Sequence, residues 1–343
     1  MFFCIQNKYI FMKNLLKHYK LLSLLFVGLI TISCSDDDNS SATNPSTIVD
    51  IAAANPDLSN LVAALQAADG DLVSVLSQGE FTVLAPTNAA FESFLSVNGF
   101  ATIDDVPTDV LSNILLNHVI TGEVPSSDLI ALGEGYSSTN AINADGDSLS
   151  LYFNTTDVVM FNGVSSVTVA DVEASNGVVH VVDAVIGLPT IATFATTNDA
   201  LSTLVAALSY ADTGSPTVQW IDTVSDPSAG PFTVFAPLND AFLDSESGIL
   251  AELGLTGFGE GADQLNAATT DAVLLMHVVS GNIQSSELPN GTVSTLGGGD
   301  ITANNTDFTL TDSYGRVSNI ITSAINIQAV NGVVHAIDKV IRP

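Results

Sequence analysis

Apolar residues along this chain recur at two spacings, one typical of helices and one typical of strands. Between residues 58 and 65 four apolar residues lie at i, i+3, i+4 and i+7, and the same spacing returns between residues 201 and 208. Short apolar runs that end in Ala-Pro, at residues 81–86 and 232–237, are typical of buried strands. The pattern therefore predicts that helices and short strands are mixed in each half of the chain.

One stretch occurs twice and organises the rest. Asn176-Gly177-Val178-Val179-His180 returns letter for letter as Asn331-Gly332-Val333-Val334-His335. Each copy lies between apolar runs of strand type, and Asn-Gly suits the two central positions of a type I′ turn. The sequence therefore predicts two antiparallel hairpins, each turning at its Asn-Gly pair.

Two further stretches repeat in the same order. Residues 81–91 and 232–242 agree at 8 of 11 positions, and apolar helical faces end in His118 and in His277. Repeated blocks of this length indicate duplicated units. We therefore predict two domains, domain 1 (residues 47–189) and domain 2 (residues 190–343), joined by almost no linker.

The N-terminal segment has the pattern of a secreted leader. Lys13, Lys17 and Lys20 precede an apolar stretch that is too short to span a bilayer, and Met12 is an alternative start. The run ending in Ser33-Cys34 resembles a bacterial lipobox, which implies that residues 1–33 are a signal peptide and that Cys34 is the lipid anchor. The alternative is an ordinary signal peptide with an incidental cysteine.

A polar tract, residues 34–46, follows and is predicted to be a flexible acidic tether. Its Ser-Asp-Asp-Asp start resembles a tag that sends some lipoproteins to the outer face of the outer membrane. A solubilising linker is the alternative. We expect an envelope protein that faces the outside.

Charge and cysteine content exclude several classes of protein. If the leader is removed before Cys34, three basic residues remain against 37 acidic ones, a formal charge of 3 − 37 = −34. Such a surface repels phosphate backbones, so we expect no nucleic-acid partner. Cys4 and Cys34 are the two cysteines of the chain, so neither domain has a disulfide or a cysteine metal site. We predict no cofactor and no metal.

Both blocks resemble the fasciclin (FAS1) domain. The resemblance rests on Phe-Thr-Val-x-Ala-Pro-x-Asn-x-Ala-Phe, on the helix that ends in Leu-Leu-x-His, and on Asn-Gly-Val-Val-His-x-x-Asp. It implies an α+β fold with two tandem fasciclin-like domains, each a twisted β-sandwich-like wedge with helices packed along one side. Some animal members contact receptors through an Asp-Ile pair, which corresponds here to Asp171-Val172 and Asn326-Ile327. The accompanying Tyr is replaced by Asn117 and Met276.

Each repeated polar residue could have either a structural role or a role in a chemical reaction. His180 and Asp183 could be parts of a catalytic triad, but residues i and i+3 of a strand point to opposite faces. We therefore interpret the four repeated histidines as buried and hydrogen-bonded. Asp145-Gly146-Asp147 is interpreted as a hairpin tip rather than a calcium loop, because the spaced ligands of an EF-hand are missing.

These observations predict a non-enzymatic, surface-anchored adhesion lipoprotein whose two fasciclin modules contact cells, matrix or polysaccharide. We expect the lipid on Cys34 to attach the protein to a membrane. The alternative is a lipoprotein that binds a glycan or a small ligand for nutrient capture, and a hydrolase is a third possibility. Trp220 and the aromatic residues of the second-domain insertion are candidate contact points, and partly buried packing is the alternative for this tryptophan.

Overall fold

The computed structural model describes residues 46–343. The predicted signal peptide, Cys34 and the rest of the tether before residue 46 lie outside the described residues. Within residues 46–343, no helix has the length and apolar character needed to cross a membrane.

Domain 1 begins with helices and ends with a run of strands. Its helices are α1 (Ile48–Ala54), α2 (Ser59–Ala67), α3 (Leu72–Gln78), α4 (Asn88–Asn98), α5 (Thr108–Leu116) and α6 (Ser126–Leu132), with 3₁₀ turns at Pro56–Leu58 and Ile103–Asp105. Its strands are β1 (Phe81–Pro86), β2 (Val119–Thr121), β3 (Glu134–Ile142), β4 (Ser148–Asn154), β5 (Met160–Phe161), β6 (Ser165–Ala174) and β7 (Gly177–Val182).

Domain 2 has a similar order, except that no α-helix follows β9 where α6 follows β2 in domain 1. Its helices are α7 (Ile191–Thr197), α8 (Ser202–Asp212), α9 (Trp220–Ser225), α10 (Asn239–Leu243), α11 (Ile249–Leu253) and α12 (Ala267–Leu275), with 3₁₀ turns at Asp199–Leu201 and Thr322–Ala324. Its strands are β8 (Phe232–Pro237), β9 (Val278–Ser280), β10 (Gly291–Ser294), β11 (Asp300–Asn304), β12 (Thr309–Thr311), β13 (Val317–Asn319), β14 (Ile327–Ala329) and β15 (Gly332–Ile337). The predicted mixture of helices and strands is confirmed.

A threonine begins the first helix of each domain. The hydroxyl of Thr47 accepts the backbone N–H of Asp50 at 3.2 Å, and the hydroxyl of Thr190 accepts the N–H of Thr193 at 3.4 Å. Such an N-cap satisfies a donor that has no partner inside the helix and contributes about 1 kcal/mol. Because Thr190 directly follows Pro189, domain 2 starts as soon as domain 1 ends.

The repeated sequence motifs form the centre of the sheet in both domains. Domain 1 has one seven-stranded sheet in the order β2-β1-β7-β6-β5-β4-β3, and domain 2 has two sheets in the orders β14-β15-β8-β9 and β10-β11-β12-β13. At the centre β1 runs parallel to β7, and β8 runs parallel to β15. These strands are mostly apolar and are buried along almost their whole length, because both of their faces are covered.

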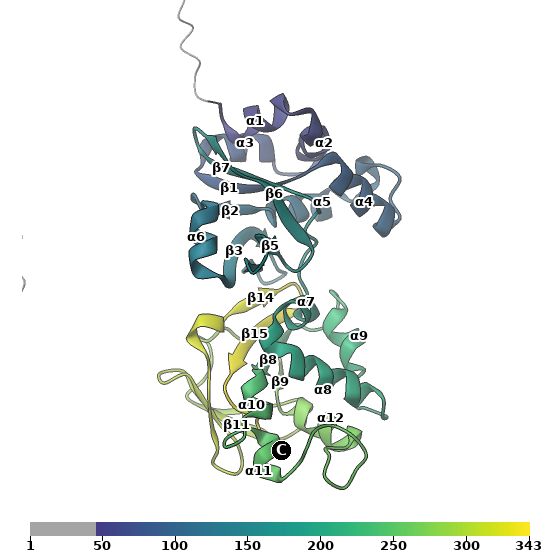
Figure 1. Ribbon diagram of the computed structural model, residues 1–343, viewed down its shortest axis with the longest axis vertical. Coiled ribbons are helices and arrows are strands. Elements are labelled where there is room, and N and C mark those ends of the chain that lie inside the picture. The colour runs from purple at the N-terminus through teal and green to yellow at the C-terminus, as the bar shows by residue number, and fades with distance from the viewer. Residues whose placement is uncertain (1–45) are drawn as a thin grey trace, which may run out of the picture. The chain divides into compact units, whose positions relative to one another are not determined.

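Each domain has two apolar clusters, one on each face of this central strand pair. In domain 1, Val83 faces a cluster shared with helices α1–α3, whereas the next residue, Leu84, faces a second cluster shared with β4 and β5. Domain 2 has the same division. Figure 1 shows α1, α2 and α3 on one side of β1 and β7, and α7, α8 and α9 beside β8 and β15. Helices α1–α3 and α7–α9 therefore pack on one face of the central strand pair of their domain, whereas Leu129 of α6 belongs to the cluster on the other face.

The predicted hairpins are present, but their turns lie one residue earlier than expected. β6 pairs with β7 antiparallel with Ala174 opposite Gly177, so the central turn residues are Ser175 and Asn176. Ala329 lies opposite Gly332 in the same way. Asn176 does not take a positive φ, so the prediction of an Asn-Gly type I′ turn is wrong.

The two glycines serve the central strand pair instead of the turn. Gly177 has φ of 134°, and a Cβ added to it would lie 1.8 Å from the carbonyl oxygen of Phe81 in β1. Gly332 has φ of 146°, and its added Cβ would lie 2.0 Å from the carbonyl oxygen of Phe232 in β8. Glycine is therefore needed because the neighbouring parallel strand comes too close for any side chain.

Polar side chains of domain 1 contact domain 2 directly. The turn between β3 and β4 carries Asp147, whose carboxylate accepts the side-chain amides of Gln284 at 2.6 Å and Asn282 at 2.8 Å. Nearby, the side-chain oxygen of Gln328 accepts the amide of Asn143 at 3.2 Å, and its backbone N–H donates to Ser150 at 2.9 Å. The predicted hairpin tip at Asp145-Gly146-Asp147 is thus part of the contact between the domains.

Aromatic residues complete this contact. The hydroxyl of Tyr136 accepts the side-chain amide of Asn198 at 3.1 Å, and its ring lies edge-on to Phe194 with 5.7 Å between centroids. Tyr152 on β4 belongs to the main apolar cluster of domain 2. The junction therefore combines buried aromatic surface with oriented hydrogen bonds.

Removal of the Asp147 carboxylate is expected to weaken the junction. Asp147→Ala leaves two partly buried amides without an acceptor and should lower the free energy of unfolding by about 1–2 kcal/mol. Differential scanning calorimetry should show a fall in Tm of about 2–4 °C. Asp145→Ala is the matched control, since this exposed carboxylate lies in the same turn and accepts no hydrogen bond. Equal effects of the two variants would contradict the assigned contact.

Candidate functional site

The repeated asparagine of each hairpin bonds to three backbone groups from two other segments. The side-chain oxygen of Asn176 accepts the N–H of Ile48 at the start of α1, and its amide donates to the carbonyls of Leu76 and Gly79. Asn331 does the same in domain 2, with the N–H of Ile191 and two carbonyls near the end of α9. All hydrogen-bonding groups of this side chain are used internally.

The repeated histidine of each hairpin bonds to backbone groups of two other segments. Nδ1 of His180 accepts the backbone N–H of Asp171 at 3.1 Å, and Nε2 lies 2.9 Å from the carbonyl oxygen of Val124. His335 makes the equivalent contacts with Asn326 and Ile283. An acceptor at Nδ1 and a donor at Nε2 define a neutral imidazole with its proton on Nε2.

The histidine after the mid-domain helix has the opposite tautomer. Nδ1 of His118 donates to the carbonyl of Ile114, and Nε2 accepts the N–H of Ile186 at 2.9 Å. His277 contacts Val273 and Ile341 in the same way. Burial lowers the pKa of each of these two histidines to about 4, against the smaller opposing effect of the bond to the helix carbonyl.

A serine, an aspartate and a histidine do meet in domain 1, but their connections differ from those of a catalytic triad. The backbone N–H and hydroxyl of Ser126 both donate to the carboxylate of Asp171, and His180 accepts the backbone N–H of Asp171. A triad needs the serine hydroxyl to donate to the imidazole. Here the imidazole bonds to two backbone groups and has no free nitrogen, so it cannot act as a general base. Asp183 accepts the N–H of Ser166 and does not reach His180 either.

Asp171 and Asn326 occupy the same unusual backbone position in the two domains. Both have φ of 57°, in the left-handed region. The Asp171 carboxylate caps the first turn of α6, and the bonds from the hydroxyl and N–H of Ser126 lower the pKa of this carboxyl. In domain 2 the side chain of Asn326 accepts the N–H of Ser285 at 2.7 Å. Sequence reasoning had singled out these residues but had missed their capping role.

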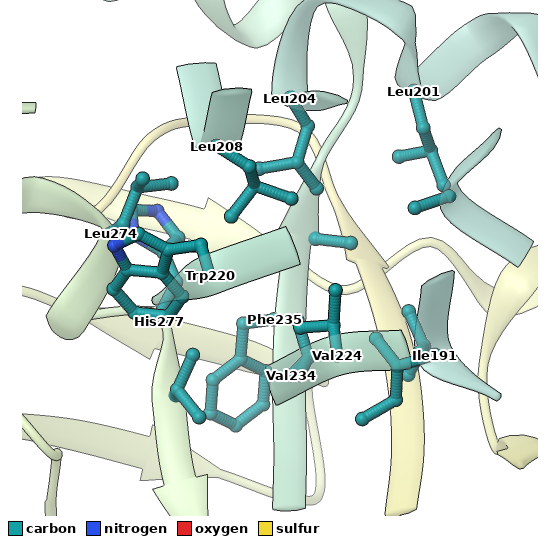
Figure 2. Close-up of a pocket in the computed structure, with 14 residues that line it drawn as sticks. Ile191, Leu201, Leu204, Leu208, Trp220, Val224, Val234, Phe235, Leu274 and His277 are labelled. Carbon is teal, nitrogen blue, oxygen red and sulfur yellow. The ribbon is translucent and has the colours of Figure 1, made fainter. Parts of the chain in front are cut away.

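A small apolar cavity lies between the helices and the central strands of each domain. Its volume is about 30 Å³ in domain 2 and about 20 Å³ in domain 1. Equivalent residues line both, such as Ile48 and Ile191, and His118 and His277. Figure 2 shows the domain 2 cavity, with Leu204, Leu208, Trp220, Val224, Val234 and Leu274 around it. Each cavity has room for about one water molecule and is lined almost entirely by apolar groups.

Trp220 belongs to the interior and not to a contact surface. Its side chain is 2% exposed at the start of α9, and its indole N–H donates to the carboxylate of Asp271 at 2.8 Å. The other oxygen of Asp271 accepts the N–H of Thr217, and Asp212 caps α9. Of the two interpretations of Trp220, packing in the interior is confirmed and a surface contact point is wrong. Its insertion folds back to close the core of domain 2.

Among residues 46–343, no group of three or more His, Cys, Asp or Glu side chains is placed to hold a metal ion. Near Leu296, the glycine-rich stretch is the turn between β10 and β11, closed by the N–H of Thr295 donating to the carbonyl of Gly299 at 2.9 Å.

The sequence profile of the Fasciclin domain matches residues 56–189 and again residues 199–343. The chain belongs to the fasciclin family. A solved FAS1 domain pair from the insect cell adhesion molecule Fasciclin I has the same fold, with a TM-score of 0.51 at 19% sequence identity over 82% of this chain and 96% of that one. The predicted fold class, two tandem fasciclin domains, is confirmed.

Several bacterial proteins are similar to one fasciclin domain of the chain. Protein sll1483 of Synechocystis is 38% identical over 154 residues, which cover 45% of this chain and 73% of that protein. The immunogenic protein MPB70 of Mycobacterium bovis is 29% identical over 174 residues, covering 47% and 83%. The cell surface glycolipoprotein MPB83 of the same species is 47% identical over 78 residues, covering 21% and 34%.

Fasciclin domains are typically non-catalytic adhesion modules, and the internal hydrogen bonds of the repeated residues agree with such a role. The side chain of each asparagine and histidine that the two fasciclin domains share at the hairpin and at the mid-domain helix bonds to backbone groups. A surface or envelope location fits the cell-surface relative. The variable surface of the two domains is therefore where contacts with partners are to be sought.

Proposed function

We propose that this protein is a non-enzymatic adhesion lipoprotein, anchored through Cys34, whose two fasciclin modules contact cells, matrix or polysaccharide outside the cell. The observation that carries the proposal is the internal use of every repeated polar side chain. Residues kept in both domains bond to the chain itself, such as Asn176 and Asn331 to the first helix of their domains. Recognition then falls to the surface, as in an adhesion module.

Lipid anchoring rests on the sequence around Cys34 and on the cell-surface glycolipoprotein among the relatives. A tether of polar residues joins this anchor to the first helix. Two modules on one anchored body raise avidity when both engage a surface at once. The acidic body keeps itself soluble and does not bind nucleic acid.

Capture of a small ligand inside a domain is the weaker alternative. Pockets that bury a small molecule usually have volumes of about 300–1,000 Å³. The two apolar cavities, at about 30 and 20 Å³, are much smaller than this and have almost no polar groups to orient a sugar. Glycans would therefore have to bind on the outer surface, which brings this alternative close to adhesion.

Cell adhesion by the full chain tests the proposal. Cells that express it should adhere to matrix- or polysaccharide-coated plates more than cells without it. Cys34→Ala should release the protein from the envelope and abolish the gain, because a chain without lipid has no membrane hold. Cys4→Ala is the matched control and should behave as wild type. Adhesion that survives loss of Cys34, or hydrolysis of an ester or glycoside panel by the purified protein, would count against the proposal.

A further inference from the structure

Positive charge is confined to one small part of the described protein. Residues 46–343 contain three basic side chains, Arg316, Lys339 and Arg342, because four of the seven in the chain precede residue 21. The same residues carry 37 − 3 = 34 acidic side chains, since Asp36, Asp37 and Asp38 lie before them. The described body thus has a formal charge of −31, and its three cations lie within 27 positions of one another.

A buried carboxylate brings these cations together in space. Asp312 directly follows β12, and one of its oxygens accepts the N–H groups of Tyr314 and Arg316 in the turn before β13. Its other oxygen accepts the N–H of Arg342 at 3.2 Å. The guanidinium of Arg316 then donates to the carbonyl of Val340 at 2.9 Å. The turn and the segment Lys339–Arg342 are therefore held against each other by their backbones.

The same place carries an exposed aromatic ring. Tyr314 is 64% exposed and is the one aromatic side chain among residues 46–343 that faces solvent to this extent. The guanidinium carbon of Arg342 lies 4.4 Å from the centre of its ring. Val317 and Leu253, which flank the ion pair of Arg316 with Glu252, are 43% and 40% exposed. We call Tyr314, Val317, Leu253, Lys339 and Arg342 the tyrosine patch.

Two cations of the tyrosine patch have no carboxylate partner. The guanidinium of Arg316 pairs with Glu252 at 2.9 Å, but within the described residues no carboxylate forms an ion pair within 4.0 Å with the side-chain nitrogens of Lys339 or Arg342. Side-chain cations without an ion pair beside an exposed tyrosine are unusual in a body with 34 acidic side chains. Tyr and Arg are also the residue types most enriched at binding hot spots. Charge complementarity points to an anionic group on the partner.

We propose that the tyrosine patch binds an acidic polysaccharide in which carboxylated sugars alternate with neutral ones. A sugar ring packs its C–H face on Tyr314, and its carboxylate pairs with Arg342 or Lys339. This inference rests on the proposed adhesive function and names the partner of one surface. The aromatic and cationic residues that would bind the sugar are not part of the repeated fasciclin motifs.

The strong negative charge of the body limits how closely the negative charges can be spaced along a polysaccharide that binds to it. Charges act over about 8 Å at physiological ionic strength, so a carboxylate on the patch interacts mainly with its local cations. A polymer with a charge on every sugar would also pass close to the surrounding acidic surface, which repels it. Spaced carboxylates avoid this repulsion. The patch therefore selects for sparse negative charge.

Binding to three defined polysaccharides tests the proposal on the full chain without its leader. Hyaluronan has one carboxylate in each disaccharide, alginate has one on every sugar, and dextran is neutral. We expect hyaluronan to bind most tightly, and Tyr314→Ala and Arg342→Gln each to weaken that binding by about tenfold, which corresponds to about 1.4 kcal/mol. Leu132→Ala, at a side chain that is 69% exposed in domain 1, should leave it unchanged.

Three results would overturn the proposal. Equal binding of hyaluronan by wild type and by both patch variants would remove Tyr314 and Arg342 from the contact. Dextran binding as tight as hyaluronan binding would remove the charge requirement. Self-association in sedimentation experiments that Arg342→Gln abolishes would make a second copy of the chain the occupant. The two patch variants could also lose hyaluronan binding while cell adhesion persists. That result would leave the proposed adhesive function intact and show that the tyrosine patch serves hyaluronan binding alone.

Discussion

Gly332→Ala is expected to destabilise domain 2 by at least about 3 kcal/mol, because a Cβ at this position has no space. It would lie 2.0 Å from the carbonyl oxygen of Phe232, a backbone atom of the parallel strand β8. The backbone has φ of 146°, which an L residue rarely adopts. To accept the methyl group, β15 would have to move away from β8 in the centre of the sheet.

Urea unfolding followed by the fluorescence of Trp220 measures this effect. Trp220 is the single tryptophan of the chain, and it is buried in domain 2, so its signal reports on that domain. We expect the midpoint to fall by about 1 M or more. Gly291→Ala is the matched control, since this glycine begins edge strand β10 with open space around it. A midpoint for Gly332→Ala within the error of the control would show that the strands tolerate a side chain here.

Acid is expected to destabilise each domain by about 3 kcal/mol between pH 7 and pH 4 through one buried histidine. Burial lowers the pKa of His277 in domain 2, and of His118 in domain 1, from 6.5 to about 4. Above pH 6.5 the imidazole is neutral in both the folded and the unfolded chain. Between pH 6.5 and 4 only the unfolded chain takes up the proton, so the free energy of unfolding falls by about 1.4 kcal/mol per pH unit.

The pH range in which the histidines change the stability is separate from the range in which the carboxylates change it. Hydrogen bonds from backbone and hydroxyl groups lower the pKa of four carboxyl groups, so their contribution is lost only at more acidic pH: Asp50, Asp171, Asp226 and Asp244. Burial also lowers the pKa of His335, which adds to the effect of His277 in domain 2. The histidines therefore dominate the first part of the acid transition.

The variant His277→Gln isolates the histidine contribution. It should be less stable than wild type at pH 7, because the bonds to Val273 and Ile341 are lost, but its stability should fall by about 3 kcal/mol less on going to pH 4. Urea unfolding at several pH values, followed by Trp220, gives both numbers. His118→Gln is the control, since it lies in the other domain and should leave the pH slope of the Trp220 transition unchanged. An unchanged slope in His277→Gln would refute the assignment.

Much of the architecture follows from local pattern. The duplication, the helical faces at residues 58–65 and 201–208, the strands at residues 81–86 and 232–237 and the hairpins at Asn176 and Asn331 come from apolar spacing and repeated letters. The turn geometry could not be read in this way. An Asn-Gly pair has the same letters whether glycine serves the turn or the approach of a distant strand, and the strand that approaches Gly177 is β1, almost 100 residues earlier.

Candidate surfaces were harder to predict than the interior. Trp220 looked like an exposed loop residue, but Asp271, 51 residues later, accepts its indole N–H and draws it into the core. Tyr314 and Arg342 had no signal of their own in the sequence, because their association depends on Asp312 binding two segments. Exposure is a property of the packed molecule and not of a single segment.

The sequence by itself determined that the protein has two homologous domains of mixed helices and strands and a strongly acidic surface, because repeats, periodicity and charge are properties of the chain alone. Only the tertiary structure decided how the polar residues are used. In the folded protein Asp147 accepts a hydrogen bond from Gln284 across the domain junction. The hydrogen-bond partners of the buried histidines fix their tautomers. The guanidinium of Arg342 lies beside the ring of Tyr314. The reason is physical: hydrogen-bond partners and exposed fractions depend on segments that meet only after the chain has folded.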